Sequence, residues 1–541
     1  MRTSIKPCFF TVAIFAACAA SACAESDRGN KQIFVFNSDG GAAAIAHSKG
    51  EVTNEVVCHE LDELEGTAVT DFFWCPIVGG NVFIYPTEVG ERIGDNIRDW
   101  AKVHPYYREQ GRAMADNLRQ LVERHEDPIK ILSARAKALG IRFWLTCRMN
   151  EIHEDDDRFM AVRSLFKEQH PELLHGKTHH PEAIYAPKKG YSYAWDYGQA
   201  PVREHFLTLF REWLRYEIDG IELDFCRSPC LFPPGQEKVG MPLLTEFVTK
   251  LRAMARATAD SRGSKVKLAI RVPPSLRRCR EAGIDVTTWI DQGLVDIVTP
   301  MDRGYFDPEP RLMEFVRLAK PHGVIVLGGI EPKVRGYRQS NRQTFAAVAT
   351  FLHSGANGVY LFNYDCHRLQ AAAWEFGGVL KPYTPDEVSF LKHALDPDVW
   401  RYHDKQYLVS QASNRKLAED GGGRPLRCRL PVGESRTFSI TIGDDLHAAV
   451  DEKRIRSSRL VVTLADCSPN PDEVDLRING QTQGPDRYRL ESRKPSGQIT
   501  ITVVDPPIRQ GTNIFKLGLK PGSRQGGLIN SIDVNIDYRS P

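Results

Sequence analysis

The chain has 541 residues, of which 42% are hydrophobic and 26% are charged, and its formal net charge at neutral pH is +2. This length is enough for a large core and a second domain. The near-balanced charge excludes the strong positive field with which proteins attract nucleic acid or anionic membranes, so we expect no nucleic-acid partner.

The N-terminus has the pattern of a secretory signal peptide over residues 1–24. A basic start precedes an apolar run from Phe9 to about Ala20, which is too short to span a bilayer. The small residues around Cys23 form an Ala-x-Ala site and predict cleavage before Glu25. Lipid attachment at Cys23 is the alternative, although the large aliphatic residue usual before such a cysteine is missing. No later stretch is long and apolar enough for a transmembrane segment, so we predict an exported protein, periplasmic or secreted.

Short apolar runs alternate with helical patterns from residue 31 to about residue 396. The runs that predict strands lie at 31–41, 68–75, 141–151, 218–227, 266–273, 294–301, 324–332 and 357–365. Helical spacing of apolar residues predicts helices at about 54–65, 107–125, 128–139, 202–217, 242–260, 286–293, 310–323, 342–356 and 385–395. A Gly-Gly turn predicts an inserted hairpin at 79–87. Glycines are expected to end helices just before strands, at Gly140, Gly220, Gly293, Gly323 and Gly358.

Eight strands that each lead into a helix predict a (β/α)8 TIM barrel with a catalytic site, over residues 31–396. A doubly wound open sheet is the alternative. No Gly-x-Gly-x-x-Gly motif follows the first strand, which disfavours a dinucleotide-binding version of that sheet.

The pattern changes beyond a predicted linker at 397–424. Apolar residues there alternate with period two between turn residues, in runs such as "SRLVVTLAD" and "SIDVNIDY". This alternation predicts a β-sandwich over residues 425–541.

Polar side chains gather at the carboxyl ends of the predicted strands, where TIM-barrel enzymes place their active sites. Glu151 and His153 also follow the third strand. The residues predicted to bind substrate or act in catalysis are Asp39, Arg148, Asn150, Glu222, Asp224, Arg227, Arg271, Asp302, Glu331, Asn363 and Asp365.

Glu222 and Asp224 lie two residues apart on an apolar strand, so both are expected to point into the barrel. Glycoside hydrolysis needs two facing carboxyl groups, and Asp224 on the fourth strand and Glu331 on the seventh are predicted to be that catalytic pair, from opposite sides of the ring. A separation of about 5 Å implies retention of the anomeric configuration, and about 6.5–9.5 Å implies inversion. For Glu222 the alternative is a structural ion pair with Arg148 or Arg271.

Aromatic residues are frequent in the predicted loops, above all in "YSYAWDY" (191–197). Sugar rings stack their C–H faces on aromatic side chains, so Trp195 is predicted to contact a carbohydrate substrate. We expect no cofactor. The competing use of the acids Glu222, Asp224, Asp302 and Glu331 is a magnesium or calcium site.

Nine cysteines lie outside the signal segment. Cys226 with Cys230, and Cys428 with Cys467, are close enough in sequence or region to form disulfides. The alternative for most of the nine is a small buried apolar residue.

The stretch "YEIDGIELDFCRSP" (216–229) resembles the fourth-strand signature of the family-10-like glycosyl hydrolases (the glycosyl hydrolase-like 10 group), in which a D-G-I-x-x-D strand leads to R-x-P. "ALGIRFWLTCRMNEIH" (138–153) and "GVYLFNYD" (358–365) are similar to the third and eighth strands of related exported bacterial glycosidases. The resemblance covers about residues 31–370. In the C-terminal region, "DLRINGQ" and "RQGTNIFKLGL" look like the jelly-roll modules of exported carbohydrate enzymes, which implies that the sandwich binds glycan or braces the barrel.

This resemblance implies a TIM barrel that acts on polysaccharide, with Asp224 as its catalytic or substrate-binding acid. The Asn-Glu pair that ends the fourth strand of xylanases is missing, so specificity for xylan does not carry over. A non-catalytic glycan-binding barrel and a metal-dependent sugar-modifying enzyme are the alternative functions.

Overall fold

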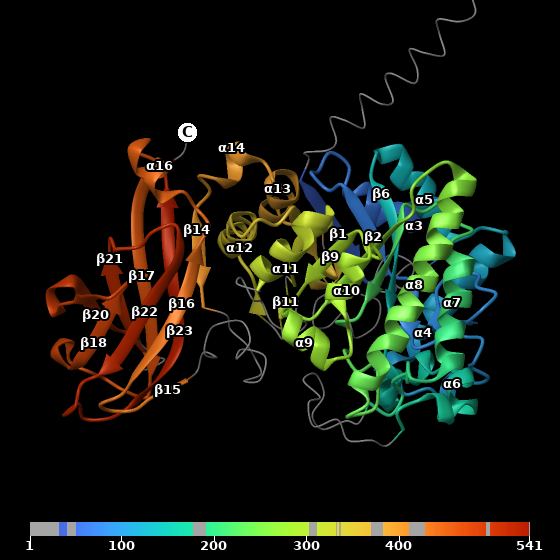
Figure 1. Cartoon of the computed structure of the whole chain (residues 1–541), viewed down its shortest axis with the longest axis horizontal. Coiled ribbons are helices and arrows are strands. Elements are labelled where there is room, and N and C mark those ends of the chain that lie inside the picture. The colour runs from blue at the N-terminus through green and yellow to red at the C-terminus, as the bar shows by residue number, and fades with distance from the viewer. Residues whose placement is uncertain are drawn as a thin grey trace, which may run out of the picture.

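The structure is a computed structural model, and it describes residues 32–40, 50–176, 191–301, 311–331, 333–334, 337–368, 382–409, 428–493 and 498–539. The predicted signal peptide with Cys23 and the predicted site residue Asp302 lie outside the described residues. Figure 1 shows two bodies side by side, a ring of strands wrapped by helices and a β-sandwich.

The first body is a closed barrel of parallel strands whose order around the ring is their order along the chain. Its strands are β1 (Ile33–Ser38), β2 (Asp71–Trp74), β6 (Arg142–Arg148), β7 (Gly220–Asp224), β8 (Lys267–Val272), β9 (Ile297–Pro300), β10 (Ile325–Ile330) and β13 (Gly358–Leu361). Strand β1 closes the ring by pairing with β13. The predicted (β/α)8 barrel is thereby confirmed.

Helices surround this ring. They include α3 (Asn54–Asp62), α4 (Pro105–Glu123), α5 (Pro128–Leu139), α7 (Ala200–Trp213), α8 (Glu237–Arg262), α9 (Leu276–Glu281), α10 (Val286–Asp291), α11 (Leu312–Ala319), α12 (Asn341–His353), α13 (Pro385–His393) and α14 (Pro397–Trp400). The predicted hairpin corresponds to β3 (Ile77–Gly79) and β4 (Val82–Phe83), which pair antiparallel.

Side chains alternate between two cores along each barrel strand. Phe34 and Leu223 face outward and join the large apolar layer between sheet and helices. Val35, Trp144 and Tyr360 face inward and form a separate cluster inside the ring. The period of two therefore puts Glu222 and Asp224 on the inner side, as predicted.

Glycines serve two purposes in the barrel. Gly140, Gly293 and Gly323 have φ angles of 71°, 61° and 67° and follow helices, as predicted. Gly220 and Gly358 open strands instead, which corrects the prediction that they end helices. A Cβ on Gly220 would lie 2.2 Å from the Trp144 ring, so only glycine leaves room for that indole inside the barrel.

The second body contains two antiparallel sheets among the described residues, and residues of both sheets share one apolar core. One sheet contains β14 (Lys405–Leu408), β15 (Cys428–Leu430), β17 (Ile455–Ala465), β20 (Tyr488–Arg493), β21 (Gln498–Val504) and β23 (Gly527–Tyr538). The other contains β16 (Ser435–Ile442), β18 (Val474–Ile478), β19 (Gln481–Gln483) and β22 (Gly511–Leu519). Strand β14 lies within the range predicted as a linker, yet it pairs with β23 and belongs to the sandwich.

Helix α12 joins the two bodies. Its Thr350 hydroxyl donates to the carbonyl of Thr441 on β16 at 3.0 Å, and Arg342 pairs with Asp537 on β23 at 2.6 Å. Ala346 of the same helix packs in the core of the sandwich. The sandwich therefore packs against a helix on the outer face of the barrel.

Every helix among the described residues is too short or too polar to cross a membrane. All nine cysteines outside the signal segment are thiols, and most are buried. The pairs Cys226–Cys230 and Cys428–Cys467 are therefore not disulfides, because cysteine here fills apolar space.

Candidate active site

Strand register brings three of the predicted residues together at the carboxyl end of the barrel. Arg148 on β6 is level with Asp224 on β7, which is level with Arg271 on β8. Residues in register on adjacent parallel strands point their side chains to the same side of the sheet. Asp224 thus has an arginine on the strand at either side.

Asp224 is held as a buried anion. Its side chain is 1% exposed. The Arg271 Nη2 atom donates to Oδ2 at 2.7 Å, and the backbone N–H groups of Cys226 and Arg227 donate to Oδ1 at 2.9 and 3.0 Å. Both oxygens of this side chain are thus held by donors, one of them a guanidinium. The guanidinium of Arg271 lies over the Phe362 ring, 3.7 Å from its centroid, which fixes the arginine across the barrel.

Glu222 lies two residues deeper and is 0% exposed. Its Oε2 atom accepts hydrogen bonds from the hydroxyls of Thr146 and Tyr360, both at 2.9 Å. Its Oε1 atom has no hydrogen-bond partner among the described residues. Burial, and then the charge of Asp224, raise the pKa of Glu222 to about 8. Its hydrogen-bond partners are hydroxyls rather than the arginine of the predicted ion pair, and the raised pKa favours the neutral acid at pH 7.

Glu151, to which the sequence assigned no role, ties the third strand end to the fourth. Its carboxylate pairs with Arg148 Nη1 at 3.1 Å, Arg227 Nε at 3.1 Å and His153 Nδ1 at 2.8 Å. Burial alone would raise the pKa of Glu151, but His153, Arg227 and Arg148 together hold it well below the usual value. Its place directly after the third strand is the signal that would have found it.

The ends of β1 and β13 meet the same cluster. Asp39 forms an ion pair with Arg148. The amide of Asn363 donates to Asp39 Oδ1 at 3.1 Å, and Asp365 Oδ1 accepts from the Asp39 backbone N–H at 3.1 Å. The structure therefore gathers Asp39, Arg148, Asn363 and Asp365 around one point, although the chain separates the first from the last by more than 300 residues.

Asn150 and Trp195 have structural rather than substrate-facing positions. The Asn150 side chain accepts from the Trp195 backbone N–H at 2.8 Å, which anchors the 191–197 loop to the end of β6. Trp195 is 1% exposed, its indole N–H donates to the Gly80 carbonyl at 3.0 Å, and the Lys167 ammonium lies over its ring. These contacts correct the predicted role of Trp195 as a sugar platform, because no face of the ring is left for a ligand.

Glu331 directly follows β10 and is half-buried. It has the strand parity of Leu327, which faces the barrel interior. Strands β7 and β10 are separated by β8 and β9, so Asp224 and Glu331 come from strands three apart in the ring. This spacing corrects the expectation that the two strands are opposite, which in a ring of eight would place them four apart.

Among the described residues, no group of three or more His, Cys, Asp or Glu side chains is arranged to hold a metal ion. The predicted alternative of a magnesium or calcium site included Asp302, which lies outside those residues. Glu222 and Asp224 are already engaged by hydroxyls and by Arg271 respectively.

Comparisons with known proteins identify no family. No family model matches the chain, and no curated protein matches its sequence. Solved structures with a similar fold include a cycloisomaltooligosaccharide glucanotransferase from Paenibacillus sp. (10% identity, TM-score 0.33, 92% of this chain and 57% of that one). A second is the glycoside hydrolase domain of PgaB (BpsB) from Bordetella bronchiseptica (11% identity, TM-score 0.40, 65% of this chain and 100% of that one). A third is alpha-L-fucosidase isoenzyme 2 from Paenibacillus thiaminolyticus (9% identity, TM-score 0.41, 94% of this chain and 100% of that one).

The chain thus spans little more than half the length of the glucanotransferase. These neighbours are carbohydrate-active enzymes, but at such identities and TM-scores the likeness supports no statement about the activity of this chain.

Proposed function

We propose that the chain is a glycoside hydrolase that cleaves glycosidic bonds of a poly- or oligosaccharide at the carboxyl end of the barrel, with Asp224 and Glu331 as its carboxyl pair. The observation that supports this most is the state of Asp224, a buried carboxylate fixed as an anion at the end of a barrel strand. Glycoside hydrolysis needs one such carboxylate and one proton donor on a second element.

The environments of the two acids suggest their roles. Asp224, ionised and oriented by Arg271, acts as the nucleophile or base and stabilises the positive charge of the transition state. Glu331 directly follows β10 and is half-buried, and in this proposal it is the proton donor to the leaving group. Because Glu222 is mostly neutral at pH 7, the ring does not hold a second negative charge next to Asp224.

The proposal also assigns residues around this pair to binding the sugar. Asp39 and Asn363 are partly exposed at the barrel end and offer an acceptor and a donor for hydroxyl groups. Arg148, Arg227 and Asp365 are buried and hold these groups in place.

The test is hydrolysis of a panel of poly- and oligosaccharides by the full chain, with Asp224→Asn and Glu331→Gln as variants. We expect each variant to lose about 10²- to 10⁴-fold in rate, the usual contribution of a catalytic acid or base. Glu246→Gln is the matched control, because this exposed glutamate on α8 pairs only with exposed Lys250 of the same helix among the ion pairs of the described residues.

Proton NMR of the first product reports the anomeric course and so separates retention from inversion. Full activity of both site variants would contradict the assigned pair. Glycan binding without hydrolysis of any panel member by the unmodified chain would favour the non-catalytic alternative.

Export completes the proposal. The pattern of residues 1–24 motivates it, and N-terminal sequencing of the mature protein would test it. A chain that begins at Glu25 in the periplasm or medium is the expected result, and an intact Met1 on cytoplasmic protein would contradict it.

A further inference from the structure

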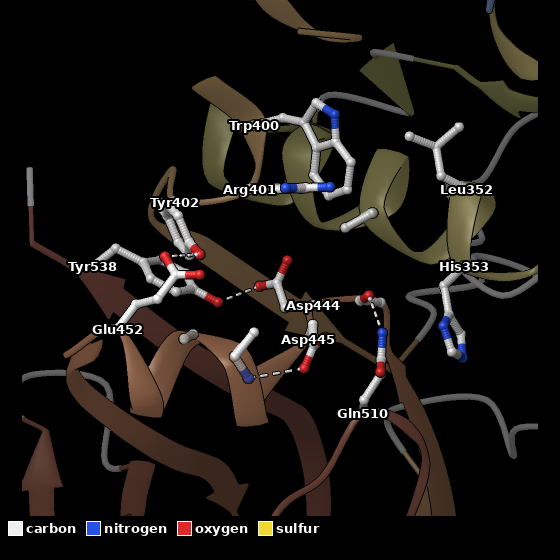
Figure 2. A pocket seen from close by; sticks show the side chains of 14 residues that line it. Leu352, His353, Trp400, Arg401, Tyr402, Asp444, Asp445, Glu452, Gln510 and Tyr538 are labelled. Atoms are coloured by element: carbon white, nitrogen blue, oxygen red, sulfur yellow. Dashed lines mark hydrogen bonds between the residues drawn. The ribbon is translucent and has the colours of Figure 1, made fainter. Parts of the chain in front are cut away.

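A cavity of about 340 Å³ lies where the barrel meets the sandwich, away from the carboxyl ends of the barrel strands. Helix α12 and the turn after α14 line it from the barrel, and helix α16 (Leu446–Asp451) with the end of β23 lines it from the sandwich. Figure 2 shows Trp400 on the barrel side and Asp444 with Gln510 on the sandwich side. The cavity therefore exists only when the two bodies are docked.

The docking around it is tight. A Cβ on Gly443 would lie 2.1 Å from the carbonyl oxygen of Ala349, so the two backbones are in direct contact at the floor of the cavity. Lys405, which is 0% exposed, donates to three carbonyl groups and pairs with Asp444 at 3.0 Å. Interior contacts of this quality fix the shape of the cavity, so it is a formed pocket rather than a loose gap.

Aromatic residues form one wall. Trp400 and Tyr402 are half-buried, and Tyr538 is buried. The Tyr402 hydroxyl donates to Glu452 Oε2 at 2.6 Å, which holds that ring against the cavity. The indole N–H of Trp400 is buried and has no acceptor among the described residues. Because no water molecule can reach this nitrogen, the Trp400 ring rather than its N–H group faces the cavity.

Polar groups of both hydrogen-bonding types surround the opening. Asp444 is neutralised by Lys405, which leaves the exposed carboxylates of Asp445 and Glu452 against the single guanidinium of Arg401. The lining therefore carries no excess positive charge with which to attract an anion. The described residues also offer no cluster of acids arranged for a metal ion.

We propose that this cavity binds a short neutral saccharide, one or two sugar rings long, independently of the barrel. A sugar presents a C–H face that packs on an indole and hydroxyls that pair with carboxylates and with the amide of Gln510. The volume lies at the lower end of the range of about 300–1,000 Å³ for small-molecule sites, which suits a mono- or disaccharide.

Fluorine NMR of the full chain labelled with 5-fluorotryptophan tests this directly. The line that disappears in Trp400→Phe identifies Trp400 among the eight tryptophans. We expect maltose, cellobiose, xylobiose or N,N′-diacetylchitobiose to shift that line saturably at about 10 mM, an affinity typical of weak small-ligand sites. Digalacturonate, an anionic disaccharide, is expected to leave it unmoved.

Gln510→Ala removes an exposed side chain and one hydrogen bond, from its amide to the Gly443 carbonyl at 3.2 Å, so we expect the fold to persist. We expect it to weaken the sugar affinity about tenfold, the equivalent of one good polar contact. The Asp224→Asn background prevents turnover and leaves the Trp400 line as a report on this cavity alone, so the outcome does not depend on the proposed hydrolysis. No saturable shift with any neutral disaccharide would overturn the proposal, and an equal response to digalacturonate would overturn the assigned ligand class.

Discussion

Replacing Glu222 by glutamine should remove a pH dependence that this buried acid gives to folding. Burial and the charge of Asp224 raise the pKa of Glu222 from 4.5 to about 8. Between these two values the folded chain keeps a proton that the unfolded chain has released, so raising the pH destabilises the fold. Below about pH 4.5 both states are protonated, and above about pH 8 the loss of stability is complete.

The magnitude follows from the size of the shift. Each pH unit between the two pKa values costs about 1.4 kcal/mol of unfolding free energy, so the unmodified protein loses about 3 kcal/mol by pH 7 and about 4 kcal/mol by pH 8. Glutamine keeps an acceptor for Thr146 and Tyr360 and cannot ionise. The variant should therefore match the unmodified protein near pH 4.5 and be about 3 kcal/mol more stable at pH 7.

Guanidinium unfolding between pH 4.5 and 8.5, followed by tryptophan fluorescence, measures this difference. All eight tryptophans lie at or before residue 400, so the signal reports the barrel side of the chain. Glu154, whose pKa is raised to about 7 by burial, contributes equally to both proteins and cancels in the difference. Parallel stability curves for the two proteins across this range would refute the assignment of a raised pKa to Glu222.

Three further predictions concern the frame around the site. Glu151→Gln leaves two buried arginines without their shared anion, so we expect a loss of about 3–5 kcal/mol of unfolding free energy, against less than about 0.5 kcal/mol for the exposed control Glu246→Gln. Gly220→Ala forces a methyl group into the Trp144 ring and should cost about 1–3 kcal/mol in the same assay; an unchanged unfolding midpoint would contradict this close approach. Asn150→Ala releases the loop after β6, so limited proteolysis should cut near residues 191–197 faster than in the unmodified protein, and equal cleavage rates would show that the anchor is dispensable.

The barrel could be predicted because its signals are local. Apolar runs of strand length alternate with helical spacing, and glycines such as Gly140 mark helix ends by their positive φ. Strand β14 was missed because it has only four residues, and a segment of that length is too short for an alternation of apolar and polar residues to stand out. The disulfide pairings failed for a related reason, since cysteine spacing does not distinguish a bridge from a small side chain that fills apolar space.

The position of the site could be predicted from the sequence, but the roles of its residues could be predicted only in part. Strand ends gave the cluster of Asp39, Arg148, Asp224 and Arg271, because parallel strands in a barrel bring their carboxyl ends to one face. Side-chain partners depend on which loop folds back over which strand, and sequence does not encode that locally. Trp195 is an example: the sequence predicts that it contacts a sugar, but its loop turns inward and buries the indole.

Two acids on the same face of the same strand thus differ in charge, one an anion and the other neutral, for a structural reason. Asp224 lies where β7 ends, so the turning backbone aims two N–H groups at it and Arg271 supplies a positive charge. Glu222 lies one layer deeper, where the neighbouring strands offer only the hydroxyls of Thr146 and Tyr360 and no backbone donor is available, because the sheet already uses them. The two hydroxyls lower the pKa of Glu222, but burial and the charge of Asp224 raise it by more, so the proton stays on Glu222. The barrel therefore presents one anion at its carboxyl end and keeps the adjacent acid neutral. The two carboxyl groups differ in charge although they lie only two residues apart in the chain.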